Sequence, residues 1–458
     1  MNRAEEGRRL VTRAVAPAVS PRCDSAPMGS GAGKLRGILR PPWVSRTLTL
    51  VWSARVSMSA GRALAGVVAP LYLAARGFGG LELGELFVGV ALASAVLSGG
   101  VGLLSDRVGR KPFLIVFPVL TGAAAVVFAT VHSVPVLFVA AALGSFGRGS
   151  GAGAGAVGPY QPAESALVTE VTPSEWRNSA FGRLQFGSSL GALAGSLLAL
   201  LAGSRRVRPE AALATFRPAF IAIAAVSLAA GVLALWMTEP ARPARPTQPG
   251  RRPRLPVKSR SLLVRLAATN SVNGLAVGMI GPFLTYWFYR RFGAGSREIG
   301  LLYAVVNAVS MSSALSAAGL ARRWGLVRTV SVVRALTAML ILPLVLAPSF
   351  ALAGVAYALR IVVQRAGLPL RQSYVVAMAD PEERSSVAAL SNVPSQVVMG
   401  LSPLASGYLL DDVSLSLPFE IAGLLQLVNA AMYWCFFRRM PPVEELPHDL
   451  PPVPEHEE

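Results

Sequence analysis

The chain has 458 residues, of which 53% are apolar and only 15% are charged. A soluble protein carries roughly a quarter of its residues as charged side chains, so much of this protein's surface is expected to face lipid. Its formal net charge of +19 could suit a nucleic-acid-binding protein. The basic residues, however, collect in short stretches between long apolar segments. That pattern indicates anchoring at a membrane face and argues against nucleic acid as a partner.

Cysteine and histidine usage narrows the function classes further. Cys23 lies in a polar N-terminal segment and Cys435 in the last apolar segment, so no disulfide framework is implied. The three histidines, His132, His448 and His456, fall in a loop or in the C-terminal tail. The usual metal ligands and general bases are therefore missing from the apolar segments. We expect no metal site, no cofactor and no enzymatic activity.

Residues 1–46 carry nine Lys or Arg residues against three acids. A short apolar run with a small-residue cleavage site does not occur before Thr47, which argues against a secretory signal peptide. We expect a disordered, basic, cytoplasmic tail. A transit peptide or a misassigned start codon are the alternatives.

The rest of the chain is dominated by apolar segments of about twenty residues. Such segments predict membrane-spanning helices, because lipid cannot satisfy backbone hydrogen bonds. The first six are expected at 47–75, 82–105, 112–131, 135–169, 179–203 and 215–237, and the second six at 262–290, 297–320, 327–347, 351–378, 385–410 and 416–437. The fourth is too long for one straight crossing. Its glycines at 151, 153 and 155 and Pro159 predict a kink or a broken turn.

The apolar segments form two sets, 47–238 and 262–438, joined by the Pro- and Arg-rich linker 239–261. An extended, flexible linker is expected from this composition. Residues 439–458 form an acidic, Pro-rich tail. The positive-inside rule places the linker and both termini in the cytoplasm, and Arg110 and Lys111 agree with this orientation. The loop at Arg205 and Arg206, expected outside, disagrees. We predict an inner-membrane protein with both termini in the cytoplasm.

The two sets of segments repeat each other. Four matches occur in the same order: Gly66 and Pro70 with Gly278 and Pro282, Glu82-Leu-Gly84 with Glu298-Ile-Gly300, Arg148 with Arg360, and Thr172-Pro173 with Asp380-Pro381. One match could arise by chance, but four in order indicate duplication. The expected fold is an all-α polytopic membrane protein of twelve helices, in two parallel six-helix halves around a central cavity. That architecture is associated with transporters.

One cytoplasmic loop carries a recognisable motif. The residues Gly102-Leu-Leu-Ser-Asp106-Arg107-Val-Gly109-Arg110-Lys111, between the second and third spans, resemble the major facilitator superfamily signature G-x-L-x-D-R-x-G-R-K at every key position. A weaker copy at Gly319–Gly325 lacks the acid. The resemblance covers residues 47–437. It implies the major facilitator fold and alternating access, in which the two halves rock about a site at the membrane midplane.

The resemblance also suggests how this loop works. Gly102 and Gly109 are expected to permit close helix packing and a tight turn. Asp106 can accept hydrogen bonds from helix termini or arginines and so lock the halves together when the cytoplasmic side is closed. The simpler alternative is that the charges only anchor the loop. The predicted gating residues are Gly102, Asp106, Arg107, Gly109, Arg110 and Lys111.

A second motif lies in the fifth span. Gly187-Ser-Ser-Leu-Gly191-Ala192-Leu-Ala-Gly195 is similar to the antiporter motif G-x-x-x-G-P-x-x-G-G, with Ala192 in place of the proline and Ala194 in place of the first paired glycine. Small residues every four positions also serve any closely packed helix pair. The two departures weaken the case for drug:proton antiport.

Polar side chains within the apolar spans are candidates for substrate binding, because charges inside a bilayer are costly. Arg62, Arg148 and Arg360 should lie near the midplane, given a rise of about 1.5 Å per helical residue. Each could instead cap carbonyl groups or pack on a neighbouring helix. The remaining candidates, which could equally hold helices together, are Gln364, Arg365, Asn273, Asn307, Tyr286 and Tyr303.

Glu164 is the only carboxylate well inside an apolar span. A buried carboxylate can bind and release a proton as its surroundings change, so Glu164 is the candidate for proton coupling. The alternative is a permanent ion pair with an arginine such as Arg177 or Arg183.

Together these patterns favour a secondary active transporter, a proton-coupled exporter of small organic compounds. An importer or exchanger of organic anions, and a membrane scaffold or receptor that has lost transport, are the alternatives. The expected partners are a small-molecule substrate, protons or another coupling ion, and the lipid bilayer, with the protein acting as a monomer.

Overall fold

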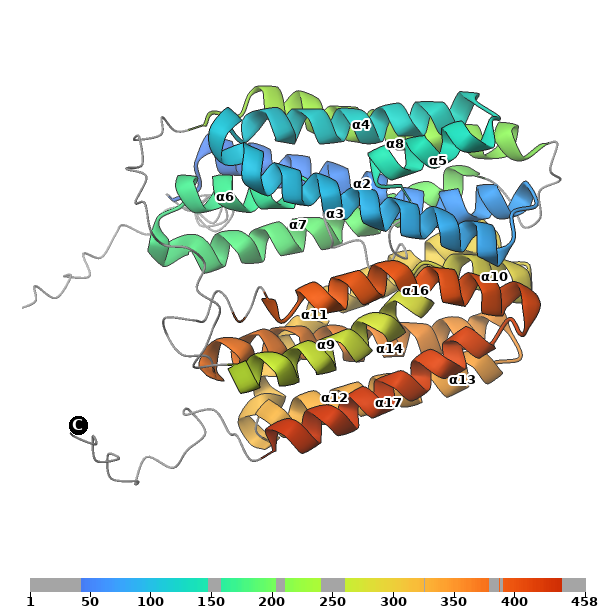
Figure 1. Ribbon diagram of the computed structural model, residues 1–458. Coiled ribbons are helices and arrows are strands. Elements are labelled where there is room, and N and C mark those ends of the chain that lie inside the picture. The colour runs from blue at the N-terminus through green and yellow to red at the C-terminus, as the bar shows by residue number, and fades with distance from the viewer. Residues whose placement is uncertain are drawn as a thin grey trace, which may run out of the picture. The chain divides into compact units, whose positions relative to one another are not determined.

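The computed structural model describes residues 43–146, 158–202, 211–239, 260–324, 326–378, 387 and 390–438. The side chains of Asp106, 312–326 and 366–377 lie outside this description. All the helices below belong to one contact unit, Ser45–Glu458. The described residues form helices joined by short loops (Figure 1).

The described residues of the first half form seven α-helices. They are α2 (Arg46–Ala75), α3 (Gly80–Val108), α4 (Lys111–Thr130), α5 (Val134–Gly144), α6 (Gln161–Val171), α7 (Arg177–Leu198) and α8 (Ala212–Leu235). Two short 3₁₀ turns, η2 (Ser174–Trp176) and η3 (Ala199–Ala202), flank α7. α2 packs against α7 and α8, and α4 packs against α8.

The second half contains eight α-helices in the described residues. They are α9 (Arg260–Ile280), α10 (Leu284–Phe292), α11 (Ser296–Trp324), α12 (Leu326–Met339), α13 (Ile341–Leu346), α14 (Phe350–Met378), α16 (Val393–Asp412) and α17 (Leu417–Phe437). α9 packs against α16 and α17, and α12 packs against α14 and α17.

These helices make the twelve expected crossings. Eight described helical segments are long and apolar enough to span a bilayer by length and composition. The other four crossings are the broken pair α5–α6 and the helices α11, α14 and α16.

Three crossings are interrupted, and local sequence explains where. α5 ends at Gly144, where Ser145 adopts a left-handed conformation, and α6 begins at Gln161 with a proline in its first turn. The break predicted in the fourth span is thereby confirmed, although residues 147–157 lie outside the described chain. The seventh span breaks between α9 and α10 at Pro282, whereas its repeat partner Pro70 lies inside the continuous α2. The ninth breaks at Leu340.

The predicted internal repeat has a structural counterpart at two helix starts. The Glu82 side chain accepts a hydrogen bond from the Gly79 N–H at 2.7 Å, and Glu298 accepts one from the Gly295 N–H at 3.0 Å. Both acids satisfy a backbone donor that a helix N-terminus leaves without a partner. The two Glu-x-Gly matches therefore begin equivalent helices, α3 and α11.

Glycines set how closely the helices approach. On α7, a Cβ on Gly191 would collide with the Val56 carbonyl of α2, and one on Gly195 with the Ala60 carbonyl. The small-residue run of the fifth span therefore packs α7 onto α2 inside the first half. This agrees with the alternative that small residues every four positions serve a closely packed helix pair.

Candidate functional site

The two halves meet through pseudo-equivalent helix pairs, α3 with α16 and α7 with α11. A Cβ on Gly84 of α3 would lie 2.6 Å from the Pro403 carbonyl oxygen of α16, and one on Gly300 of α11 would lie 2.7 Å from the Ser196 carbonyl oxygen of α7. Real Cβ atoms do not approach oxygen so closely. The glycines of the two Glu-x-Gly repeats thus permit the contact between the halves.

Asp411, at the C-terminal end of α16, closes the same contact. Its carboxylate accepts hydrogen bonds from the N–H groups of Gly80 and Leu81, each at 2.8 Å. These are free donors of the α3 N-terminus, where a negative charge is favourable. We call the end of the bundle that carries loops 76–79, 293–295 and 413–416 the Asp411 end, and the opposite end, with loops 109–110 and 172–176, the Arg110 end.

Toward the Arg110 end, α3 no longer packs closely against α16. A Cβ on Gly400 of α16 would still meet Ala91, but a Cβ on Gly99, Gly100 or Gly102 would meet no heavy atom of the described residues within 4 Å. Val96 and Leu103 of α3 are 75% and 81% exposed. Close packing was expected at Gly102, and among the described residues no neighbour packs against it.

A second contact between the halves is buried within the bundle. Thr285 of α10 donates to the Gly66 carbonyl of α2 at 3.2 Å, and its hydroxyl is 3.0 Å from the Tyr303 hydroxyl of α11. Because Thr285 has a single hydroxyl proton, Tyr303 is the donor in the second bond. This chain links one helix of the first half to two helices of the second.

The first half contains a buried ion pair between Arg55 of α2 and Glu164 of α6. Arg55 Nε lies 2.9 Å from Glu164 Oε1, and Nη2 lies 2.7 Å from Oε2, so the pairing is bidentate. Arg55 Nη1 also donates to Ser188 of α7 at 3.4 Å. Glu164 is 1% exposed. The partner expected from the sequence, Arg177 or Arg183, was wrong, because the rotation of α2 brings Arg55 to the carboxylate.

Arg62 lies on the same face of α2 as Arg55, since seven residues make almost two helical turns. It is half-buried, and its guanidinium packs directly against Gly158, so that a Cβ on Gly158 would collide with it. Tyr160, between Gly158 and Glu164 in the sequence, is buried and interacts electrostatically with Glu164, Arg55 and Arg62. α2 and the fourth span therefore share a polar seam inside the first half.

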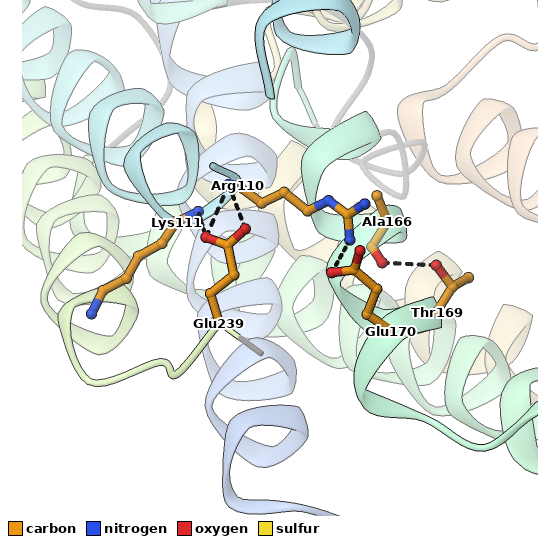
Figure 2. A network of polar contacts seen from close by, with 6 residues as sticks. All are labelled: Arg110, Lys111, Ala166, Thr169, Glu170 and Glu239. Atoms are coloured by element: carbon orange, nitrogen blue, oxygen red, sulfur yellow. Dashed lines mark hydrogen bonds and ion pairs between the residues drawn. The ribbon is translucent and has the colours of Figure 1, made fainter. Parts of the chain in front are cut away.

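Figure 2 shows a network at the Arg110 end. The Glu239 carboxylate, just after α8, accepts from the Arg110 N–H at 3.1 Å and from the Lys111 N–H at 3.3 Å, so it caps the start of α4. The Arg110 side chain reaches the other way and forms an ion pair with Glu170 of α6. Lys111 contributes its backbone, and its side chain points away from Glu239 (Figure 2).

The loop bearing this network depends on Gly109, whose φ is +110°. That conformation is nearly exclusive to glycine. A Cβ there would also lie 3.2 Å from Glu239 Oε2. The tight turn expected at Gly109 is thus present. Arg107 is exposed, and the Asp106 side chain lies outside the described residues.

The second half carries the other predicted binding residues. Arg365 of α14 donates to Asn307 Oδ1 of α11 at 3.2 Å, and Asn307 donates to Ser196 Oγ of α7 at 3.3 Å. Arg360 is 3% exposed. Tyr286 is buried beneath the Arg290 guanidinium. Gln364 and Asn273 are half-buried and form no hydrogen bond within the described chain, and Arg148 lies outside it.

Four residues with structural roles were missed by sequence reasoning: Arg55, Glu170, Glu239 and Asp411. Arg55 had a signal, because a carboxylate inside an apolar span needs a cation and Arg55 lies in a neighbouring span. The three acids lie at span ends, where carboxylates are common. Within the described residues, no group of three His, Cys, Asp or Glu side chains is arranged to hold a metal ion.

Two six-helix repeats, crossings of membrane length and polar residues gathered inside the bundle define a multi-pass membrane protein with the architecture of a transporter. The sequence profile of the Major Facilitator Superfamily matches residues 51–359 and 266–456. The chain belongs to this superfamily.

Its relatives include transporters of several kinds. The chain is 24% identical over 408 residues to the multidrug resistance protein MdtG of Rahnella sp., covering 86% of this chain and 94% of that protein. It is 22% identical over 382 residues to the synaptic vesicular amine transporter of Bos taurus, covering 80% and 68%. Residues of the quinolone resistance protein NorA of Staphylococcus aureus match at 29% identity over 115 positions, 25% of this chain and 27% of NorA.

Solved structures confirm the fold. A bacterial homologue of the lysosomal transporter Spinster, inward-facing and unoccupied, superposes with a TM-score of 0.65 at 16% identity, covering 87% of this chain and 98% of that one. A D-xylose–proton symporter superposes with a TM-score of 0.64 at 16% identity, covering 85% and 97%.

Proposed function

We propose that this protein is a secondary active transporter that works by alternating access and exports small organic compounds, driven by protons. The observation that carries the proposal is the one-sided contact of α3 with α16. The helices are joined at the Asp411 end through Gly80, Gly84 and Asp411, whereas toward the Arg110 end the α3 side chains of Val96, Leu103 and Leu104 are exposed.

This asymmetry supports a conformation closed at one membrane face and open at the other. Basic residues of the signature loop and of the linker at 239–261 favour the Arg110 end as the cytoplasmic one. The conformation would then be inward-open. In the opposite state, the exposed stretch of α3 would approach the N-terminal part of α16, where Val393 and Val397 are each 55% exposed.

The signature loop would govern that second closure. Arg110 and Glu239 hold the loop to α6 and α8 of the first half. Asp106, one turn before Gly109, would then be positioned to bond the second half when the cytoplasmic ends meet, with Arg107 beside it.

Export of organic compounds is the direction supported by the relatives, because two of them are named as drug resistance proteins. Proton coupling is supported by the buried Arg55–Glu164 pair. A proton on Glu164 would cancel its attraction for Arg55, so the protonated and ionised forms should favour different packings of α2, α6 and α7. Exchange between the two forms would link proton movement to the opening of the halves.

Transport in proteoliposomes tests this function. Purified protein is reconstituted, and accumulation of a quinolone, a monoamine and an anionic dye is followed with and without an imposed pH gradient. We expect uphill accumulation of at least one compound only with the gradient. In Glu164→Gln, uphill accumulation should be lost, while exchange of substrate across the membrane without a gradient survives.

Two further variants make the test specific. The double variant Arg55→Gln with Glu164→Gln removes both charges of the pair, so neither is left uncompensated. It should also exchange substrate across the membrane without accumulating it. Glu175→Gln changes an exposed glutamate of η2 and should behave as the wild type. Undiminished uphill accumulation in the Glu164 variants would assign Glu164 to structure alone.

A further inference from the structure

Arg360 is a buried cation for which the described chain offers no counter-charge. Its side chain lies on α14, ten residues after the helix begins, or about 15 Å along the axis. That distance is about half the thickness of a bilayer's hydrocarbon core. The residue is 3% exposed, and its Nε is fully buried without an acceptor. No described residue forms a hydrogen bond or an ion pair with this guanidinium.

The charges nearby do not offset it. Glu164 is the one buried carboxylate among the described residues, and Arg55 holds it in the other half. Arg365, further along α14, donates to the neutral side-chain oxygen of Asn307. Arg360 thus has no described carboxylate beside it. A buried charge without a partner is strongly unfavourable, so an anion from outside the chain would be stabilised here.

The position of Arg360 relative to the closed end points to a transported ligand. Tyr357 precedes it by one helical turn, and the Tyr357 ring lies 5.8 Å from that of Tyr303. Tyr303 bonds Thr285, which bonds the Gly66 carbonyl of the first half. Arg360 therefore lies one turn beyond the buried contact between the halves, on the side toward the Arg110 end.

The guanidinium of Arg360 itself suits one kind of ligand. An arginine fork matches a carboxylate with two parallel hydrogen bonds, which a lysine cannot reproduce.

We propose that Arg360 binds the carboxylate of an organic acid. This inference rests on the proposed function, in that the bound acid is a transported substrate. It names the substrate class that the export proposal leaves open.

The test compares acids with their own methyl esters. Binding of a quinolone carboxylic acid, an aminobenzoic acid and a naphthoic acid, and of the three esters, is measured by titration of purified full-length protein in uncharged detergent. We expect at least one acid to bind the wild type more tightly than its ester. Arg360→Gln should weaken that acid about 10- to 100-fold, the range that loss of charge-assisted hydrogen bonds implies, and should change its ester less than twofold. The affinity of Arg360→Lys for that acid should lie between those of the wild type and of Arg360→Gln.

Arg297→Gln is the matched control, because it removes an exposed arginine from the same half. Thermal unfolding of each variant shows that the fold is retained, and Arg360→Lys serves if the glutamine variant unfolds. An unchanged acid affinity, equal losses for acid and ester, or failure of every acid to bind the wild type would each overturn the proposal. Binding in detergent requires no transport, so a failed export proposal and a failed Arg360 assignment are distinguishable.

Discussion

The Asp411 carboxylate of α16 caps the N-terminus of α3 in the other half of the protein, 2.8 Å from the Gly80 N–H. A helix cap normally lies within its own segment, and this one spans 331 positions of sequence. The bond can exist only while the two halves are together at the Asp411 end. Capping energy that would ordinarily stabilise one helix therefore stabilises one conformation of the whole molecule.

Removing this cap should open the Asp411 end. A helix cap contributes about 1 kcal/mol, which corresponds to about a fivefold change in a two-state ratio. We expect Asp411→Ala to lower the population closed at this end by about that factor, as measured by distances between spin labels at Ser133→Cys and Val413→Cys with the native cysteines replaced. Asp412→Asn, its neighbour at the same end, should leave the distances unchanged. An unshifted distribution in Asp411→Ala would contradict the role of the cap.

Gly84 and Gly300 should respond alike to substitution, because each lies against a carbonyl of the other half. Valine at either position would obstruct closure of the Asp411 end without disturbing the fold of its own half. We expect the same label pair to report a longer distance in both variants, with an unfolding temperature close to that of the wild type. Gly89→Val is the control on α3, since a side chain there meets open space. Opposite responses at positions 84 and 300 would argue against pseudo-symmetric gating.

Sequence patterns predicted a large share of this architecture. The lengths of the apolar segments located the crossings, and the Glu82 and Glu298 matches marked two equivalent helix starts. What they could not predict depends on the rotation of one helix against another. The pairing of Arg55 with Glu164 is fixed by which face α2 turns to α6, and the sequence of α2 alone, apolar on nearly every side, does not specify it.

The same reasoning explains the missed caps. Glu239 lies at the start of the segment predicted to be a linker, yet it caps α4 more than a hundred positions earlier. From the sequence alone, Asp411 is expected to be an ordinary solvated acid at the end of a span. Caps supplied from distant sequence leave no local pattern, whereas Glu82 and Glu298 were recognisable because each caps its own helix.

The buried pair in the first half should show strong coupling in stability. Removing one partner of a buried ion pair costs about 3–5 kcal/mol, because the remaining charge is left uncompensated. We expect Arg55→Gln and Glu164→Gln each to lower the unfolding temperature in detergent. The double variant should unfold at a temperature no lower than that of the less stable single variant. Glu175→Gln should have no effect. Strictly additive losses in the double variant would show that the two side chains stabilise the fold independently.

The two signature glycines should differ sharply. Gly109→Ala places a side chain at φ +110° beside Glu239, and strain of this kind costs about 1–3 kcal/mol. We expect a lower unfolding temperature and loss of transport. Gly102→Ala adds a methyl group in open space and should leave the unfolding temperature unchanged. If Gly102→Ala nevertheless slows transport, the closed cytoplasmic state is where that glycine packs. Equal stability of the two variants would refute the positional requirement at Gly109.

Alternating access requires the two ends of the bundle to open in turn. It is tested most directly by two label pairs in reconstituted protein: Ser133→Cys with Val413→Cys at the Asp411 end, and Ser179→Cys with Val393→Cys at the Arg110 end. All four positions are exposed, and each pair joins one half to the other. Distances are measured by pulsed electron spin resonance across a range of pH, with and without a transported substrate. We expect two distance populations in each pair, and we expect the two pairs to shift in opposite directions, with the distance at one end lengthening as the distance at the other end shortens. Distances that change together at both ends, or that stay fixed while transport proceeds, would contradict it.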